Sequence, residues 1–197
     1  MKKKLFVVGL TSLPGGGKDF VADILVSDYG FYKASPGEII RKRLKKEHRG
    51  VLTREMQQKM QEKWRRVHGS DYIMELCYSF ALRHGKKNVV IPGIRFPRDI
   101  AFYKRRLDGN FINIFITADP KIRFQRIMAR KREDSPASYR DFIRHDSRET
   151  KIFNLMKTRT LSDLDIDNSK NGSGNLRKKI RSIMGKYGFR PRRARRL

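Results

Sequence analysis

The 197-residue sequence is poor in cysteine and in acidic residues, and it has no long apolar run. Cys77 is its single cysteine, so the chain cannot form an internal disulfide, which is typical of proteins from reducing compartments. The apolar run near the start, Leu5–Leu10, is shorter than the core of a secretion signal, and "TSLPGGGK" interrupts it. No other run could span a bilayer, so we expect a cytoplasmic protein with no membrane partner.

The charge is strongly one-sided, with 47 lysines and arginines against 20 acidic residues and a formal net charge of +27. Solubility requires far less, so we expect a polyanionic partner. RNA or the ribosome fits best, although an anionic membrane surface would also attract such a chain. The alternative is a basic surface that only keeps the protein in solution and has no specific partner. Residues 41–66 hold eleven basic residues against three glutamates, and the last eight residues hold five arginines. These two stretches are the predicted RNA-binding surface.

Short apolar runs alternate with helical patterns along the chain. Strands are expected over 5–9, 31–34, 87–94, 111–119 and 163–168. Helices are expected over 18–30, 35–48, 53–68, 70–84, 97–107, 120–131, 137–149 and 174–188. Ser35, Pro36 and Glu38 form a helix-start signature, and Gly30 is a natural helix stop. The alternation indicates βαβ units, and hence an α/β fold with a parallel sheet.

The stretch "SLPGGGKDF", Ser12–Phe20, lies between the first strand and the first helix. A glycine-rich turn here directs backbone N–H groups and a helix N-terminus toward one point, and a lysine adds a mobile positive charge. Such a loop binds phosphate. It departs from the usual G-x-x-x-x-G-K-[ST] pattern at Ser12 and Asp19, so a glycine turn without a ligand is the alternative.

Several segments resemble nucleoside monophosphate kinases. "PGGGK" resembles the phosphate-binding loop (P-loop) of adenylate kinases, and "SPGEIIR" resembles their acceptor-nucleotide segment. "VVIPGIRFPR" resembles their third strand, and "RFQRIMARKRED" resembles the helix that enters the lid. "IDNSKNGSGNLRKKI" is similar to the last strand, loop and helix of dephospho-coenzyme A kinases. The segments occur in the family's order over roughly residues 4–185.

The resemblance implies a three-layer P-loop kinase fold over residues 1–186, with a five-stranded parallel sheet in the order 2-3-1-4-5. It also implies a helical acceptor-binding insertion over 36–85 and a short lid over 130–137. Residues 187–197 would follow as a basic, disordered tail.

The resemblance also implies roles for individual residues. ATP would be bound by Pro14, Gly15, Gly16, Gly17, Lys18, Asp19 and Phe20. Lys18, Arg126 and Arg130 would act on the transferred phosphoryl group, with Arg132 as a further candidate. A small phosphorylated acceptor would be bound by Ser35, Glu38, Arg41 and Arg95.

Two departures from the family pattern concern Mg²⁺. Pro92 stands where the third strand usually ends in a carboxylate, and proline cannot bind a metal. Asp19 could supply the missing oxygen ligand, and Asp99 and Asp119 are alternatives that the sequence cannot place. Two hypotheses follow: an ATP-dependent kinase for a nucleoside monophosphate or similar acceptor, or a kinase-fold protein of weak or no activity that binds nucleotide and RNA.

The remaining reactive residue types give weaker signals. The four histidines lack zinc-site spacing. Cys77 lies among apolar helical positions and is predicted to be a core residue. Trp64 lies on a very basic helix, where core packing is favoured over base stacking.

Overall fold

A computed structural model describes residues 5–47, 52, 54–130, 135–170 and 173–192. Its strands are β1 (Phe6–Ser12), β2 (Tyr32–Lys33), β3 (Asn88–Pro92), β4 (Phe111–Thr117) and β5 (Leu164–Asp167). They form one parallel sheet in the order β2-β3-β1-β4-β5. The predicted fold class and strand order are therefore confirmed.

The helices that connect these strands are α1 (Lys18–Tyr29), α2 (Pro36–Glu47), α3 (Arg54–His68), α4 (Tyr72–Arg83), α5 (Pro97–Leu107), α6 (Pro120–Met128), α7 (Tyr139–Ile152), α8 (Leu155–Leu161) and α9 (Ser173–Lys186). The sequence pattern did not predict α8. This helix has only 7 residues, and Asn154 at its N-cap adopts a left-handed conformation without a side-chain capping bond. Its signals are therefore too few for a periodic pattern to reveal it.

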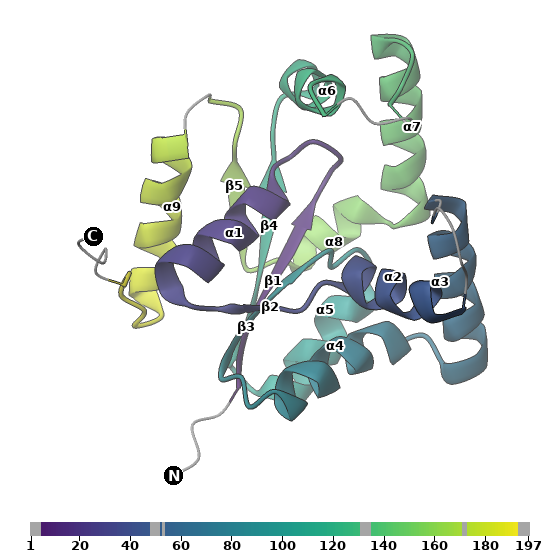
Figure 1. Cartoon of the computed structure of the whole chain (residues 1–197). Helices are drawn as coiled ribbons and strands as arrows, with labels where there is room; N and C mark the ends of the chain where they lie inside the picture. The colour runs from purple at the N-terminus through teal and green to yellow at the C-terminus, as the bar shows by residue number, and fades with distance from the viewer. Residues whose placement is uncertain (1–4, 48–51, 53, 131–134, 171–172, 193–197) are drawn as a thin grey trace.

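Helices cover both faces of the sheet, which gives three layers (Figure 1). Consecutive strand residues point to opposite faces, so Val8 packs with α1 and α9 while Val7 packs with α4 and α5. Both faces are thus buried, which explains why the strands are continuous apolar runs in the sequence. Cys77 lies in the layer of α4, as predicted, and its burial raises the pKa of the thiol well above the ordinary value.

The insertion helices α2 and α3 pack around a small apolar cluster of their own, which contains Ile40, Leu44 and Met60. Trp64 contacts this cluster and meets the Tyr72 ring edge-on, with the ring centroids 5.8 Å apart. This geometry supports the packing role that the sequence favoured for Trp64.

The C-terminal segment packs closely against the domain as far as it is described. Phe189 contacts the rings of Phe6 and Phe31 at centroid distances of 5.0 and 5.1 Å. The Arg192 backbone N–H donates to the Asp28 carbonyl at 2.6 Å. The predicted disordered tail from 187 onward therefore begins too early, because an aromatic side chain anchors the segment on the core. Residues 193–197 lie outside the described residues.

Within the described part of the chain, no helix has the length and apolar character needed to cross a membrane.

Candidate functional site

The glycine-rich loop connects the end of β1 to the start of α1, as the sequence predicted. Gly15 and Gly17 have φ angles of 78° and 105°, a left-handed conformation that favours glycine. A Cβ atom on Gly15 would lie 2.5 Å from the Arg123 carbonyl oxygen, and one on Gly16 would lie 2.9 Å from the Ile116 carbonyl oxygen. Side chains are thus excluded here by close backbone contacts.

The N-terminus of α1 is left open by this loop. Gly17 is the N-cap, and it has no side chain that could accept a hydrogen bond from the first N–H groups of the helix. Such groups, together with the positive end of the helix dipole, form a favourable site for a phosphate group.

Lys18 and Asp19 form an ion pair at the mouth of this loop. The Lys18 Nζ donates to Asp19 Oδ2 at 3.0 Å, and the Asp19 side chain is 51% exposed. Partial burial acts to raise the pKa of the Asp19 carboxyl, but Lys18, with Lys33 and Arg130 farther away, lowers it below the ordinary value. Asp19 is therefore negatively charged at neutral pH.

Arg123 fixes the loop from behind, a role that the sequence did not reveal. Its guanidinium donates to both carboxylate oxygens of Asp146 at 2.6 and 2.8 Å. It also donates to the carbonyls of Ala118 at 3.0 Å and Pro14 at 3.2 Å. The Arg123 side chain is only 3% exposed and Asp146 13%. One buried ion pair thus connects the P-loop, the end of β4 and α7. A single arginine among 47 basic residues gave no signal for this role.

The two arginines expected in the lid helix lie on the loop side of the sheet. Arg126 donates through Nη2 to the Asn168 carbonyl at 2.9 Å, while its Nη1 is buried without a hydrogen-bond partner. Burial, and then the charge of Arg130, lowers the pKa of Arg126. Asn168 donates in turn to the Gly16 carbonyl at 2.9 Å. Asn168 was a missed contact, although it lies in the segment that resembles dephospho-coenzyme A kinases. The predicted lid residues 131–134, including Arg132, lie outside the described residues.

The residues predicted to bind the acceptor lie in two segments, at the start of α2 and after β3. The Ser35 hydroxyl accepts the Glu38 N–H at 3.4 Å, so Ser35 caps α2 as predicted, and Glu38 is exposed. Arg41 is exposed on α2. Arg95 follows β3, and its guanidinium lies 4.7 Å from the centroid of the Phe153 ring.

The two alternative metal carboxylates have structural tasks instead. Asp99 is 2% exposed, and its Oδ2 accepts the backbone N–H groups of Arg95 at 3.1 Å and Phe96 at 3.0 Å. Burial raises the pKa of Asp99, although these hydrogen bonds act against the rise. Asp119 caps α6 by accepting the Lys121 N–H at 2.8 Å. Pro92 ends β3 and is buried. Asp19 is therefore the acidic residue of the loop that keeps an exposed carboxylate.

The fold resembles those of solved proteins, among them a shikimate kinase. A shikimate kinase from Acinetobacter baumannii in complex with shikimate superposes with a TM-score of 0.59 and 14% identity, over 94% of this chain and 96% of that one. TT1252 from Thermus thermophilus superposes with a TM-score of 0.59 and 18% identity, over 93% and 98%. These identities show the fold alone, which is a kinase-like P-loop fold and not a particular kinase subfamily.

No family model matches the sequence. Several relatives, however, are similar in sequence. A UPF0200 protein of Methanococcus vannielii is 34% identical over 146 residues, which cover 73% of this chain and 76% of the relative. A UPF0200 protein of Methanothermobacter thermautotrophicus is 31% identical over 148 residues, with 74% and 72% covered. The chain therefore belongs to the UPF0200 protein family.

Proposed function

We propose that the protein is an ATP-dependent kinase that transfers the γ-phosphoryl group to a small phosphorylated acceptor, such as a nucleoside monophosphate. The observation that carries this proposal is the meeting of three elements at one edge of the sheet. The open N-terminus of α1 and the Lys18 ammonium, which pairs with Asp19, belong to the loop, and Asn168 connects the loop to Arg126, whose Nη1 has no partner. The unpaired N–H groups of the helix and of Arg126, with the positive charge of Lys18 beside them, suit an anionic ligand.

The donor phosphates of ATP fit these residues. The backbone N–H groups of Gly15–Gly17 and the Lys18 ammonium would hold them, while Arg126 and Arg130 would neutralise charge on the transferred group. A phosphate oxygen would supply the acceptor that the buried Nη1 of Arg126 lacks. Binding ATP would thus remove a desolvation cost that the free protein carries.

Mg²⁺ fits less completely. Asp19 would hold it, because a charged and half-exposed carboxylate is a suitable ligand for a hard cation. When bound, the metal supplies positive charge to the donor phosphates. Lys18 competes for the same carboxylate, and Pro92 offers no second ligand.

The acceptor would be oriented by Arg41 and Arg95, whose planar guanidinium groups match phosphate oxygens. An acceptor oxygen would then form a bond to the γ-phosphorus of ATP while the bond to the β-phosphate oxygen breaks, releasing ADP. The protein's contribution is to position the two phosphates and to neutralise their charge.

The test is ATP binding by calorimetry, together with ADP release in the presence of a panel of monophosphate acceptors. Lys18→Ala should weaken ATP binding at least about tenfold, or about 1.4 kcal/mol. Lys178→Ala on α9 removes the same charge from an exposed position and should leave binding unchanged. Equal ATP affinity in both variants would disprove the P-loop assignment.

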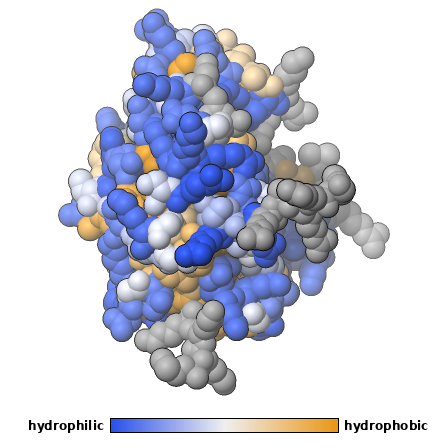
Figure 2. Space-filling model, turned by 90° about the vertical axis from the view of Figure 1, so that its left-hand side faces the viewer, coloured by the Kyte–Doolittle hydropathy of each residue, from blue (hydrophilic) through white to orange (hydrophobic). Residues whose placement is uncertain are grey.

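A second function is favoured by the surface. Figure 2 shows a largely hydrophilic face on the side where α9 lies. Basic side chains exposed on α9 and the segment after it are Arg177, Lys178, Arg181, Lys186, Arg190 and Arg192. This basic surface favours RNA binding. Pro92, which stands where a metal-binding carboxylate is usual, favours weak or no catalytic activity. Together they favour a nucleotide-binding protein that also binds RNA. ATP binding without turnover of any acceptor, combined with RNA binding, would favour this second function.

A further inference from the structure

Arg95, which follows β3 and is predicted to bind the acceptor phosphate, is held at three points. Its backbone N–H donates to Asp99 Oδ2 at 3.1 Å, and its backbone carbonyl accepts the Thr158 hydroxyl at 2.9 Å. Its guanidinium carbon lies over the Phe153 ring, 4.7 Å from the ring centroid. These contacts fix the backbone of Arg95 and thus the point from which its side chain extends.

The Thr158 hydroxyl makes a contact outside its own helix. Thr158 lies in α8 and is fully buried. A threonine hydroxyl within a helix often donates to the carbonyl four residues earlier, which here belongs to Asn154. That carbonyl lies 3.2 Å from Thr158 Oγ1, whereas the Arg95 carbonyl lies 2.9 Å away. Because a hydroxyl has only one hydrogen to donate, the shorter distance favours Arg95 as its partner.

The helix that carries Thr158 is itself anchored on the sheet. Ser162, the C-cap of α8, donates through its hydroxyl to the Thr158 carbonyl at 2.8 Å and accepts from Asn113 Nδ2 at 2.8 Å. Asn113 is fully buried in β4, and its Nδ2 also donates to the Thr11 hydroxyl of β1 at 3.0 Å. A connected series of buried and half-buried polar groups therefore extends from β1 and β4 through α8 to Arg95.

One short segment of the chain thus contacts both ends of Arg95. Phe153 lies beneath the guanidinium, and Thr158, five residues later, binds the backbone carbonyl. A guanidinium binds a phosphate best through two parallel hydrogen bonds, which require a narrow range of orientations. A displacement of about 1 Å at a reacting group can cost roughly a hundredfold in rate, so a loose Arg95 would bind and orient an acceptor poorly.

We propose that Thr158 is a positioning residue for Arg95, whose backbone it holds so that the guanidinium meets the phosphate of the acceptor. The proposal deepens the proposed kinase function and rests on it. It gives α8, which contains none of the residues predicted to bind ATP or the acceptor, an influence on acceptor affinity.

The experiment is a double-mutant cycle between Thr158 and Arg95. Calorimetry measures the binding of inorganic phosphate and of adenosine, guanosine, cytidine and uridine monophosphates. Lys18→Ala is the background, because it should weaken binding at the P-loop. In this background, Arg95→Met should weaken binding of the tightest probe at least about tenfold, and Thr158→Val at least about fivefold. Once Arg95→Met is present, adding Thr158→Val should weaken binding less than about twofold, because a positioning residue acts only through the residue that it positions.

Three further variants separate positioning from a general effect on the fold. Thr158→Ser keeps the hydroxyl and should bind the probe within about twofold of the background. Thr160→Val is the matched control, because Thr160 is exposed on the same helix and its hydroxyl donates to the Lys157 carbonyl at 2.9 Å. It should leave the affinity unchanged. Thr158→Ala is a second variant without the hydroxyl, to be used if thermal unfolding shows that Thr158→Val does not fold.

Equal losses from Thr158→Val with and without Arg95→Met would overturn the proposal, because the threonine would then act on the fold as a whole. A loss in Thr158→Ser as large as that in Thr158→Val, or binding of none of the probes, would also overturn it. Failure of the kinase function gives a different result, in which the cycle shows coupling but ATP and the acceptor panel give no turnover. Where transfer occurs, Thr158→Val should raise the KM of the acceptor at least about fivefold and change the KM of ATP less than about twofold.

Discussion

Replacing Asp146 by alanine should destabilise the protein strongly, because it leaves the buried Arg123 charge without its partner. Arg123 is 3% exposed and is bound by both carboxylate oxygens of Asp146. Removing one member of a buried pair typically costs about 3–5 kcal/mol. Since Asp146 is 13% exposed, water can enter the vacated space, and we expect the lower end of this range. In a domain of this size, about 3 kcal/mol corresponds to a fall of roughly 6–12 °C in the unfolding temperature.

The assay is urea and thermal unfolding of Asp146→Ala beside Arg144→Ala. Arg144 lies on the same helix and pairs with Asp141, but its side chain is 75% exposed, so its loss should cost less than about 0.5 kcal/mol. ATP affinity should also fall in Asp146→Ala, because Arg123 holds the Pro14 carbonyl of the P-loop. Equal unfolding midpoints for the two variants would refute the role given to the buried pair.

Three further predictions concern charge. Asp19→Asn should reduce Mg²⁺-dependent ATP affinity, because an amide is a poorer ligand for a hard cation; tighter metal-free binding with no metal effect would instead favour the nucleotide-binding alternative. Asp99 has a raised pKa in the folded protein, so the free energy of unfolding should fall as pH rises above about 3.9, the ordinary value, and Asp99 ionises. Asp99→Asn should remove this part of the pH dependence of the unfolding free energy. An unchanged pH dependence in the variant would contradict the assignment. Under the second proposed function, deleting 193–197 should reduce the salt dependence of RNA binding, by about 0.7 per lost contact on single strands, without changing ATP affinity; superimposable salt plots would exclude a role for this segment.

The fold was largely predictable because buried parallel strands and capped helices leave strong local signals. The apolar run that became β1 and the cap at Ser35 are examples, whereas the strand order came from the resemblance to known kinases. Long-range pairing was not predictable. Arg123 and Asp146 lie on different helices, and nothing in the local sequence distinguishes this arginine from its exposed neighbours.

The packing of the C-terminal segment was also not predictable from the sequence. Its composition is that of a disordered basic tail, yet Phe189 alone contributes two ring contacts with the core. The overall composition of a segment hides the effect of one apolar residue, whereas the packing of the segment depends on where that one side chain lies. The sequence alone could not distinguish Asp99 and Asp119 from metal ligands, because their hydrogen bonds to backbone N–H groups depend on the local fold.

The length of α1 separates the two regions that the proposed functions assign to anionic ligands (Figure 1). Its first residue, Lys18, belongs to the P-loop, while the Asp28 carbonyl near its last turn holds Arg192. Its 12 residues correspond to about 18 Å along the helix axis. A polyanion bound at Arg192 would therefore not compete directly with ATP for the loop, and the two ligands could occupy the protein at the same time.

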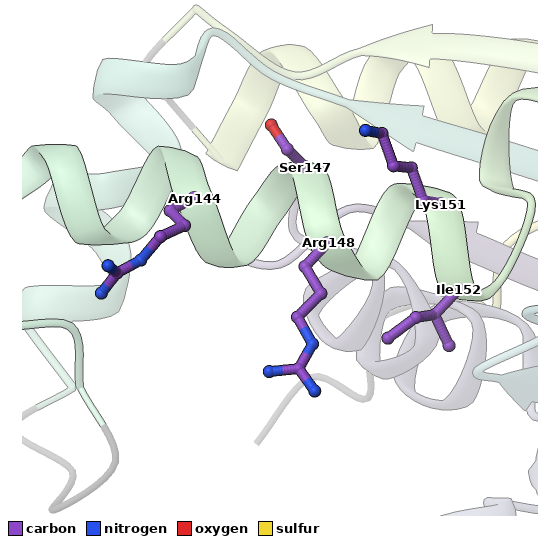
Figure 3. A pocket seen from close by; sticks show the side chains of 5 residues that line it. All are labelled: Arg144, Ser147, Arg148, Lys151 and Ile152. Atoms are coloured by element: carbon purple, nitrogen blue, oxygen red, sulfur yellow. The ribbon is translucent and has the colours of Figure 1, made fainter.

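The hollow on the outside of α7 belongs to neither region. It has a volume of about 450 Å³ and is lined by Arg144, Ser147, Arg148, Lys151 and Ile152. Figure 3 shows Arg144 and Arg148 extending to one side of the helix and Ser147 and Lys151 to the other. Phe153, the residue after this helix, contacts Arg95, so α7 extends from the buried pair of Asp146 with Arg123 to the segment that follows β3. Under the proposed kinase function, α7 would therefore contact both the support of the P-loop, through Asp146, and a residue predicted to bind the acceptor, Arg95.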